Sequence, residues 1–206
     1  MKNLAGLFQD GTVRKVYSYP DYMLLMELVV MEQRTTGPKQ SEELNDYTKL
    51  NLHRMQRLNK TVVLSEGLKM AVNQITFPQT WYVLTEAWCG DAAQNIPVLA
   101  AMSKLNPLIT MQLLLRDENT DLMDLYLSNG GRSIPKLIAV DTAFNEIFTW
   151  GPRPAGAQHL LTLYKENPLQ TYKEFGEDIH KWYTADKTQS VQKELLSILQ
   201  GVSVEK

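Results

Sequence analysis

The sequence has very little of the chemistry that holds metals or cross-links. Its 206 residues include one cysteine and three histidines. A single cysteine excludes an intrachain disulfide framework and a zinc site built on cysteines. The histidines, at positions 53, 159 and 180, are too widely separated along the chain to form a ligand pattern. We therefore expect no metal site and no cofactor.

The chain also lacks a long apolar run. Its densest apolar stretch, Tyr22–Met31, contains Glu27 and is far shorter than the about 20 apolar residues of a membrane span. This stretch predicts a buried helix. Residues 1–16 include the charged side chains of Asp10, Arg14 and Lys15 and lack the apolar run of a signal peptide. We expect no membrane association and a cytoplasmic location, where thiols stay reduced.

Charge of one sign is not in excess either. The net charge is -2, and basic residues are interleaved with acidic ones. The richest basic cluster, Lys49–Lys60, has the spacing of an amphipathic helix rather than of a continuous basic block. The sequence therefore predicts no nucleic-acid partner. An apolar fraction of 44% and a charged fraction of 21% are ordinary for a globular protein of this size.

Helical periodicity dominates both ends of the chain, and strand signals lie in the middle. Helices are predicted first over Tyr22–Gln33, Ser41–Asn59 and Leu64–Ile75. Buried strands are predicted over Trp81–Thr85, Ile109–Leu115, Lys136–Val140 and Asn145–Trp150. Further helices are predicted over Asp91–Leu105, Thr120–Leu127, Ala155–Lys165, Leu169–Tyr183 and Thr188–Leu199. The central alternation predicts an α/β fold with a mixed sheet flanked by helices and ending in a hairpin.

One turn in this pattern carries a recognisable motif. The residues Trp88-Cys89-Gly90-Asp91-Ala92 lie between a predicted strand and a predicted helix, and they resemble the Trp-Cys-Gly-Pro-Cys motif of thioredoxins. Pro97, Arg132-Ser133-Ile134-Pro135 and Gly151 fall in register with further landmarks of that family. The resemblance covers roughly Thr61–Tyr164. It implies a thioredoxin-like fold in which Pro135 is cis and faces the cysteine.

The resemblance also implies a division of the chain. We expect a helical N-terminal extension over residues 1–60 packed on the core, a thioredoxin-like domain over 61–166, and a C-terminal helical extension over 167–206. The N-terminal helices lie where many thioredoxins have their first strand, so we expect them to replace it.

The departures from the thioredoxin motif bear on activity. Ala92 stands in place of the second cysteine, so no intramolecular disulfide can form. Asp91 replaces the motif proline, and Val83 stands where thioredoxins carry a buried acid. Another acid, Glu86, lies three residues before Cys89. This Glu-x-Trp-Cys-Gly-Asp pattern is similar to that of a bacterial branch of thioredoxin-like proteins with a helical N-terminal extension.

Cys89 is the candidate catalytic residue. Unpaired amides at a helix N-terminus favour the thiolate over the thiol, so we expect a lowered pKa. Glu86 and Asp91 are candidates for moving the proton of an arriving or leaving thiol, although Asp91 also suits a plain helix N-terminus. The candidate substrate-binding residues are Trp88, Gly90, Ile134, Pro135 and Arg153. For Arg153 the simpler interpretation is a solvated arginine in a surface loop.

Two functions fit these residues. The first is monothiol thiol–disulfide chemistry, in which Cys89 forms a mixed disulfide with a protein or a low-molecular-weight thiol or disulfide and an outside thiol resolves it. The alternative is a redox-inactive binding module that keeps the groove beside Pro135, where a thioredoxin pairs with an extended peptide as an added strand. The missing second cysteine leaves both open.

Overall fold

The computed structural model describes residues 2–167 and 169–204. The N-terminal elements are α1 (Ala5–Gln9), β1 (Val16–Ser18), α2 (Tyr19–Met31), α3 (Glu42–Thr61) and α4 (Glu66–Asn73). Serine side chains begin both α3 and α4: Ser41 accepts a hydrogen bond from the N–H of Leu44, and Ser65 accepts one from that of Leu68. These caps satisfy amides that a helix start would otherwise leave unpaired.

The central and C-terminal elements follow in the predicted order. They are β2 (Gln79–Thr85), α5 (Gly90–Ser103), β3 (Ile109–Leu115), η1 (Arg116–Glu118), α6 (Thr120–Asp124), β4 (Lys136–Val140), β5 (Glu146–Trp150), α7 (Ala155–Glu166), α8 (Tyr172–Asp186) and α9 (Gln189–Val204). The strands lie in the order β1-β3-β2-β4-β5. Only the β2–β3 pair is parallel, and the others are antiparallel. The predicted mixed sheet flanked by helices is confirmed.

One prediction about the sheet is wrong. The N-terminal helices do not replace the first strand, because β1 pairs antiparallel with β3 at the edge of the sheet, with Tyr17 opposite Leu113. Tyr17 is buried, whereas Val16 and Ser18 on either side of it are exposed. Three residues are too few for this alternation to stand out in a sequence.

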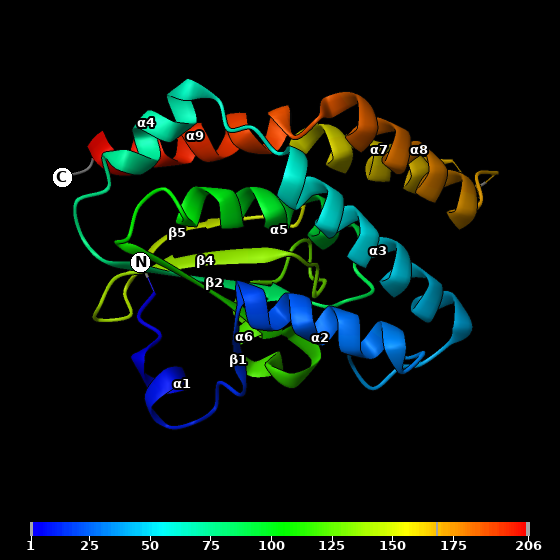
Figure 1. The fold of residues 1–206 in the computed structure, drawn as a ribbon, viewed down its shortest axis with the longest axis horizontal. Coiled ribbons are helices and arrows are strands. Elements are labelled where there is room, and N and C mark those ends of the chain that lie inside the picture. Colours follow the sequence, from blue (N-terminus) through cyan, green and yellow to red (C-terminus); the bar gives the residue numbers. More distant parts are fainter. Residues whose placement is uncertain (1, 168, 205–206) are drawn as a thin grey trace.

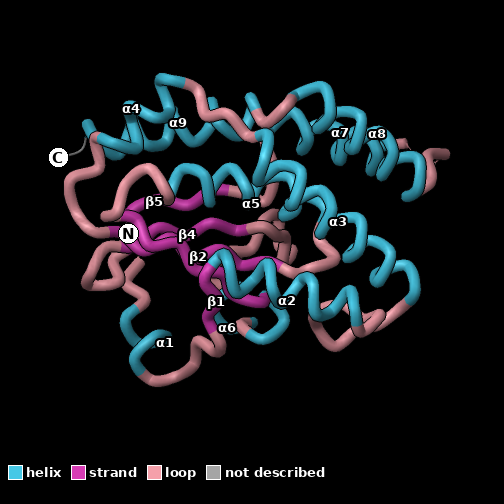
Figure 2. The backbone as a smooth tube through the Cα atoms, in the orientation of Figure 1, coloured by secondary structure: helices cyan, strands magenta, loops and turns pink. Residues whose placement is uncertain are grey.

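Helices cover both faces of the sheet (Figures 1 and 2). α5, α9 and α4 lie on one side, and α2 and α6 lie on the other. α3 packs along α5, and its N-terminal end reaches beyond the sheet, as do α7 and α8. The start of α5 therefore lies between α3 and the C-terminal helices.

A single apolar core joins distant parts of the chain. Leu4, Tyr22, Met55 and Leu195 belong to one cluster of buried side chains with the strand residues. α2 is not the fully buried helix that its apolar run predicted. Its Met26 side chain is buried, but Leu24 and Met31 are exposed, because only one side of α2 faces the sheet and α3.

α7 and α8 have a small core of their own. Ala157, Phe175, Ile179 and Tyr183 form a second buried cluster, separate from the main one. Lys187 and Thr188, between α8 and α9, adopt left-handed backbone conformations with φ of 50° and 67°. The α7–α8 pair is therefore a distinct packing unit at the end of the molecule where α5 begins.

Within residues 2–167 and 169–204, none of the helices combines the length and the apolar composition that a membrane span requires.

We predict that the α3–α5 contact is essential for stability. Met55 on α3 is 1% exposed, so Met55→Ala leaves a cavity and lowers the free energy of unfolding by about 2–5 kcal/mol. Met70→Ala is the matched control, because Met70 is 63% exposed, and it changes stability by no more than about 0.5 kcal/mol. Urea unfolding measures both. Equal effects of the two substitutions would contradict this packing.

Candidate functional site

The cysteine lies at the start of α5, between the helix and the proline loop. Cys89 is the N-cap residue, and its Sγ accepts a hydrogen bond from the N–H of Ala92 at 3.4 Å. The thiol donates to the carbonyl oxygen of Ile134 at 3.3 Å. The Ile134–Pro135 peptide bond is cis. The structure therefore brings Cys89 and the Ile134–Pro135 loop into direct contact.

Burial decides the protonation state of this thiol. Cys89 is 7% exposed, and burial raises the pKa of its thiol to about 12, with the nearby Asp91 carboxylate adding to the rise. The Ala92 N–H and Arg153 act in the opposite direction but are weaker. The expected lowering of the pKa by the helix terminus is therefore wrong, because loss of hydration outweighs the amides. At neutral pH the thiol keeps its proton.

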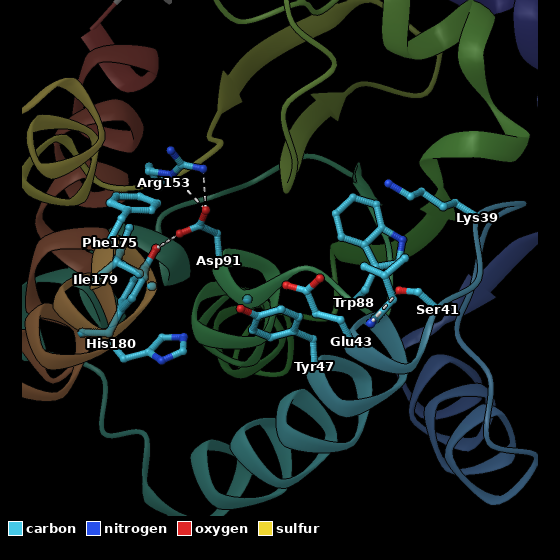
Figure 3. A pocket seen from close by; sticks show the side chains of 14 residues that line it. Lys39, Ser41, Glu43, Tyr47, Trp88, Asp91, Arg153, Phe175, Ile179 and His180 are labelled. Carbon is cyan, nitrogen blue, oxygen red and sulfur yellow. Dashed lines mark hydrogen bonds and ion pairs between the residues drawn. The ribbon is translucent and has the colours of Figure 1, made fainter. Parts of the chain in front are cut away.

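Asp91 is held in an ion pair rather than in solvent. Its Oδ2 accepts hydrogen bonds from Nε and Nη2 of Arg153 at 2.8 and 2.6 Å, and its Oδ1 accepts one from the hydroxyl of Tyr183 at 2.6 Å (Figure 3). Burial raises the pKa of Asp91, and Arg153 opposes that rise. The Asp91 and Arg153 side chains are 12% and 14% exposed, so neither is a solvated surface charge.

Asn95 strengthens the same connection. Its Nδ2 donates to the Asp91 carbonyl oxygen at 2.8 Å and to the Tyr183 hydroxyl at 3.1 Å. α8 is thus attached to the first turn of α5 by polar contacts around one carboxylate.

The Glu86 carboxylate and the Cys89 thiol contact different residues. Glu86 is 1% exposed and accepts hydrogen bonds from the Thr36 hydroxyl and from the N–H of Asp117 at 2.9 Å. Thr36 in turn accepts a hydrogen bond from the N–H of Ala87. Burial raises the pKa of Glu86. The carboxylate therefore joins the loop before α3 to the ends of β2 and β3.

Trp88 lies on the other side of the turn and is half-buried. The Arg116 guanidinium stacks 4.9 Å from the centre of its ring and pairs with Asp117 at 2.7 Å. Arg116 also donates to the carbonyl oxygen of Arg132 in the proline loop, at 3.2 Å. These contacts fix Trp88 beside the Ile134–Pro135 loop.

A cavity of about 290 Å³ opens next to the turn. Figure 3 shows Trp88 and Tyr47 on one side and Phe175, Ile179 and His180 of α8 on the other. The lining residues are Lys39, Ser41, Glu43, Leu44, Tyr47, Trp88, Gly90, Asp91, Arg153, Phe175, Gly176, Ile179, His180 and Tyr183. Four predicted site residues, Trp88, Gly90, Asp91 and Arg153, line this cavity. The other predicted residues, Cys89, Glu86, Ile134 and Pro135, lie outside its lining.

Comparison with known families agrees with this geometry. A thioredoxin family model, Thioredoxin_9, matches residues 37–173, which is more than half of the chain. The chain belongs to this thioredoxin family. The match begins before α3 and ends at the start of α8, so α3 and the cysteine turn of this thioredoxin-family protein fall inside the matched segment, whereas the α8 residues that line the cavity lie beyond it.

Two solved structures share the fold. One is a protein of unknown function from Pseudomonas aeruginosa, with 18% identity, a TM-score of 0.53, and coverage of 90% of this chain and 98% of that chain. The other is an HIV epitope-scaffold, with 18% identity, a TM-score of 0.53, and coverage of 90% and 99%. Identities this low support the fold alone. The comparison with curated proteins gives no match.

No role was predicted for the residues that α8 contributes to the cavity. Phe175, His180 and Tyr183 were part of a predicted helix with no assigned role, and no local motif marks them. Only their helical spacing, which places them on one side of α8, hints at a shared surface. No group of three possible metal ligands occurs among the residues searched, 2–167 and 169–204.

We predict a pH signature for Glu86. A raised pKa means that the folded chain binds this proton more tightly than the unfolded chain does, so the contribution to stability is full below the ordinary glutamate pKa and is lost as the pH rises through the folded-state pKa. The stability of the wild-type chain relative to Glu86→Gln therefore increases when the pH falls from about 7 to about 4.

Urea unfolding at the two pH values measures this difference. Glu177→Gln, at an exposed position on α8, is the control and lacks the trend. A wild-type advantage that shrinks on acidification would show that Glu86 is held as a stabilised carboxylate instead.

Proposed function

We propose that this protein is a thioredoxin-fold binding module that takes an extended peptide segment against the Ile134–Pro135 loop, with Cys89 kept as a neutral thiol. The observation that carries the proposal is the burial of Cys89, which is 7% exposed and whose thiol donates to the Ile134 carbonyl oxygen. At a pKa of about 12, the thiolate fraction at neutral pH is on the order of 10⁻⁵, against a few per cent for a free cysteine. Because Ala92 stands where the second cysteine would be, the chain has no second thiol to resolve a mixed disulfide with a partner.

The peptide groove is supported by the backbone of Ile134. Its carbonyl oxygen accepts only the weak Cys89 S–H donor, and its N–H has no hydrogen-bond acceptor among the described residues. A donor and an acceptor on one residue are what strand addition requires. Trp88, held by Arg116 beside this loop, offers an aromatic surface for a partner side chain.

Monothiol exchange is the second candidate function. It is favoured by the Ala92 N–H, which points at Sγ as it would to stabilise a thiolate. Exposure of the thiol would require its contact with the Ile134 carbonyl oxygen to open. In this scheme the Cys89 thiolate attacks a protein or low-molecular-weight disulfide, one thiol leaves with the electron pair, and an external thiol resolves the mixed disulfide.

The wider assignment follows from the same residues. We propose that the protein belongs to the bacterial branch with the Glu-x-Trp-Cys-Gly-Asp motif and acts in a cytoplasm where a lone thiol stays reduced. Glu86 then has a structural role at the base of the turn, and Asp91 sets the thiol environment through its pair with Arg153.

A displayed library of random linear peptides tests the binding module. We expect the same peptides to be enriched by the wild-type chain and by Cys89→Ala, because the groove uses backbone groups and Trp88 rather than sulfur. Trp88→Ala weakens the selected peptides about tenfold, in line with the loss of one well-packed aromatic anchor. Trp182→Ala, on the α7–α8 pair, is the matched control and leaves their affinity unchanged.

Enrichment of cysteine-containing peptides alone, lost in Cys89→Ala and on addition of a reductant, would favour monothiol exchange. Failure to enrich any peptide with either chain would reject the groove.

A further inference from the structure

The cavity beside the turn is bordered by a cation that has no acidic partner. Arg54 of α3 is half-buried, and the described residues in hydrogen-bond contact with its side chain are both neutral. Its Nη1 donates to Oδ1 of Asn51 at 3.0 Å, and its Nη2 lies 2.8 Å from Nε2 of His180. Burial and the neighbouring Arg54 lower the pKa of His180 to about 4, so its ring is neutral at pH 7. Among the described residues, no carboxylate forms an ion pair with Arg54.

Arg54 reaches the cavity through two of the lining residues. His180 is one, and the other is Gly90, where an added Cβ would lie 3.8 Å from Nη1 of Arg54. The charge is therefore close to the space beside the turn even though Arg54 lies behind its wall.

The other charges around the cavity do not supply the missing anion. Asp91 is already paired with Arg153, and Nη1 of Arg153 is buried with no hydrogen-bond acceptor among the described residues. Lys39 and Glu43 also line the cavity, and neither has an ion-pair partner in the described part of the chain. Together with Arg54 they leave two cations and one carboxylate unpaired around the cavity, which is a net positive charge that an anionic ligand would balance.

The walls of the cavity are largely aromatic and aliphatic. Phe175 and Ile179 project from α8, and Trp88 and Tyr47 face them from the turn and α3 (Figure 3). A volume of about 290 Å³ lies just below the range of about 300–1,000 Å³ typical of ligand sites. The space suits one ring or one branched side chain, and a bare inorganic anion would leave the apolar walls without contacts.

We infer that this cavity binds a small organic carboxylate with an aromatic or branched apolar body. The carboxylate supplies the countercharge for Arg54, and the apolar body lies between Trp88 and Phe175. The two sites share Trp88, but they differ in their polar contacts, since the groove uses the backbone of the Ile134–Pro135 loop and the cavity uses α3 and α8.

Calorimetric titration with matched probes tests the charge requirement. Phenylacetate and its neutral amide, phenylacetamide, have nearly the same shape, and acetate lacks the apolar body. We expect phenylacetate to bind about tenfold or more tightly than either of the others, because only it satisfies both the cation and the walls. Inorganic phosphate does not compete with it.

Substitutions on one helix locate the site. Arg54→Gln lowers the phenylacetate affinity about tenfold and Arg54→Lys retains most of it, whereas Arg57→Gln, one turn further along α3 and exposed, leaves it unchanged. Lys39→Gln is a second test at an exposed position where folding is not at risk, and it lowers the affinity of the anion but not that of the amide.

Three results would overturn the inference. They are equal binding of phenylacetate and phenylacetamide, no binding of either at millimolar concentration, and equal losses in Arg54→Gln and Arg57→Gln. None of them bears on peptide binding by Cys89→Ala, so failure here is distinct from failure of the proposed function.

Discussion

The ion pair between Asp91 and Arg153 is the contact on which the state of the cysteine turn depends. It places a carboxylate and a guanidinium, both nearly buried, over the first turn of α5. Tyr183 binds the second carboxylate oxygen and brings α8 with it. Removing one partner would leave the other charge buried and unpaired, at a cost of about 3–5 kcal/mol. The pair therefore holds α8 over the turn.

The chemistry of the cysteine follows from its burial and from the neighbouring Asp91 carboxylate. A helix N-terminus lowers the pKa of a cysteine only when the stabilisation of the thiolate by the free amides is larger than the cost of removing the thiolate from water. Here Cys89 is buried and a carboxylate lies close by, so both larger effects favour the neutral thiol. The features that make a thioredoxin reactive are its exposed thiol, its low pKa and its resolving cysteine. In this chain Ala92 replaces the resolving cysteine. The Cys89 thiol is buried rather than exposed, and its burial together with the Asp91 carboxylate raises its pKa.

Sequence reasoning works well where the signal is local. The bounds predicted for β3 and β4 match the structure, because each is a short apolar run between turn residues. The cysteine turn and the proline loop were found from short motifs, and the structure brings Cys89 and Ile134 into contact. β1 was missed because three residues carry no periodicity that stands out.

The site itself depends on contacts that no local pattern encodes. Asp91 and Tyr183 are 92 residues apart in the chain. Asp91 is more than a simple helix-start residue because of this distant contact, which the sequence around Asp91 does not reveal. The pKa of Cys89 was predicted in the wrong direction because a motif shows the helix terminus but not the burial around it. Arg54 and His180, 126 residues apart, raise the same difficulty. Tertiary burial, rather than residue type, decides how these groups behave.

The most direct test of this account is the pKa of the Cys89 thiol in the intact protein. Ultraviolet absorbance of the thiolate, recorded against pH and corrected with Cys89→Ala, gives that value. We predict a pKa well above the ~8.5 of a free cysteine, with no thiolate detectable at neutral pH. A pKa at or below ~7 would contradict the account, since it would show a thiolate stabilised by the helix terminus and a turn prepared for disulfide exchange.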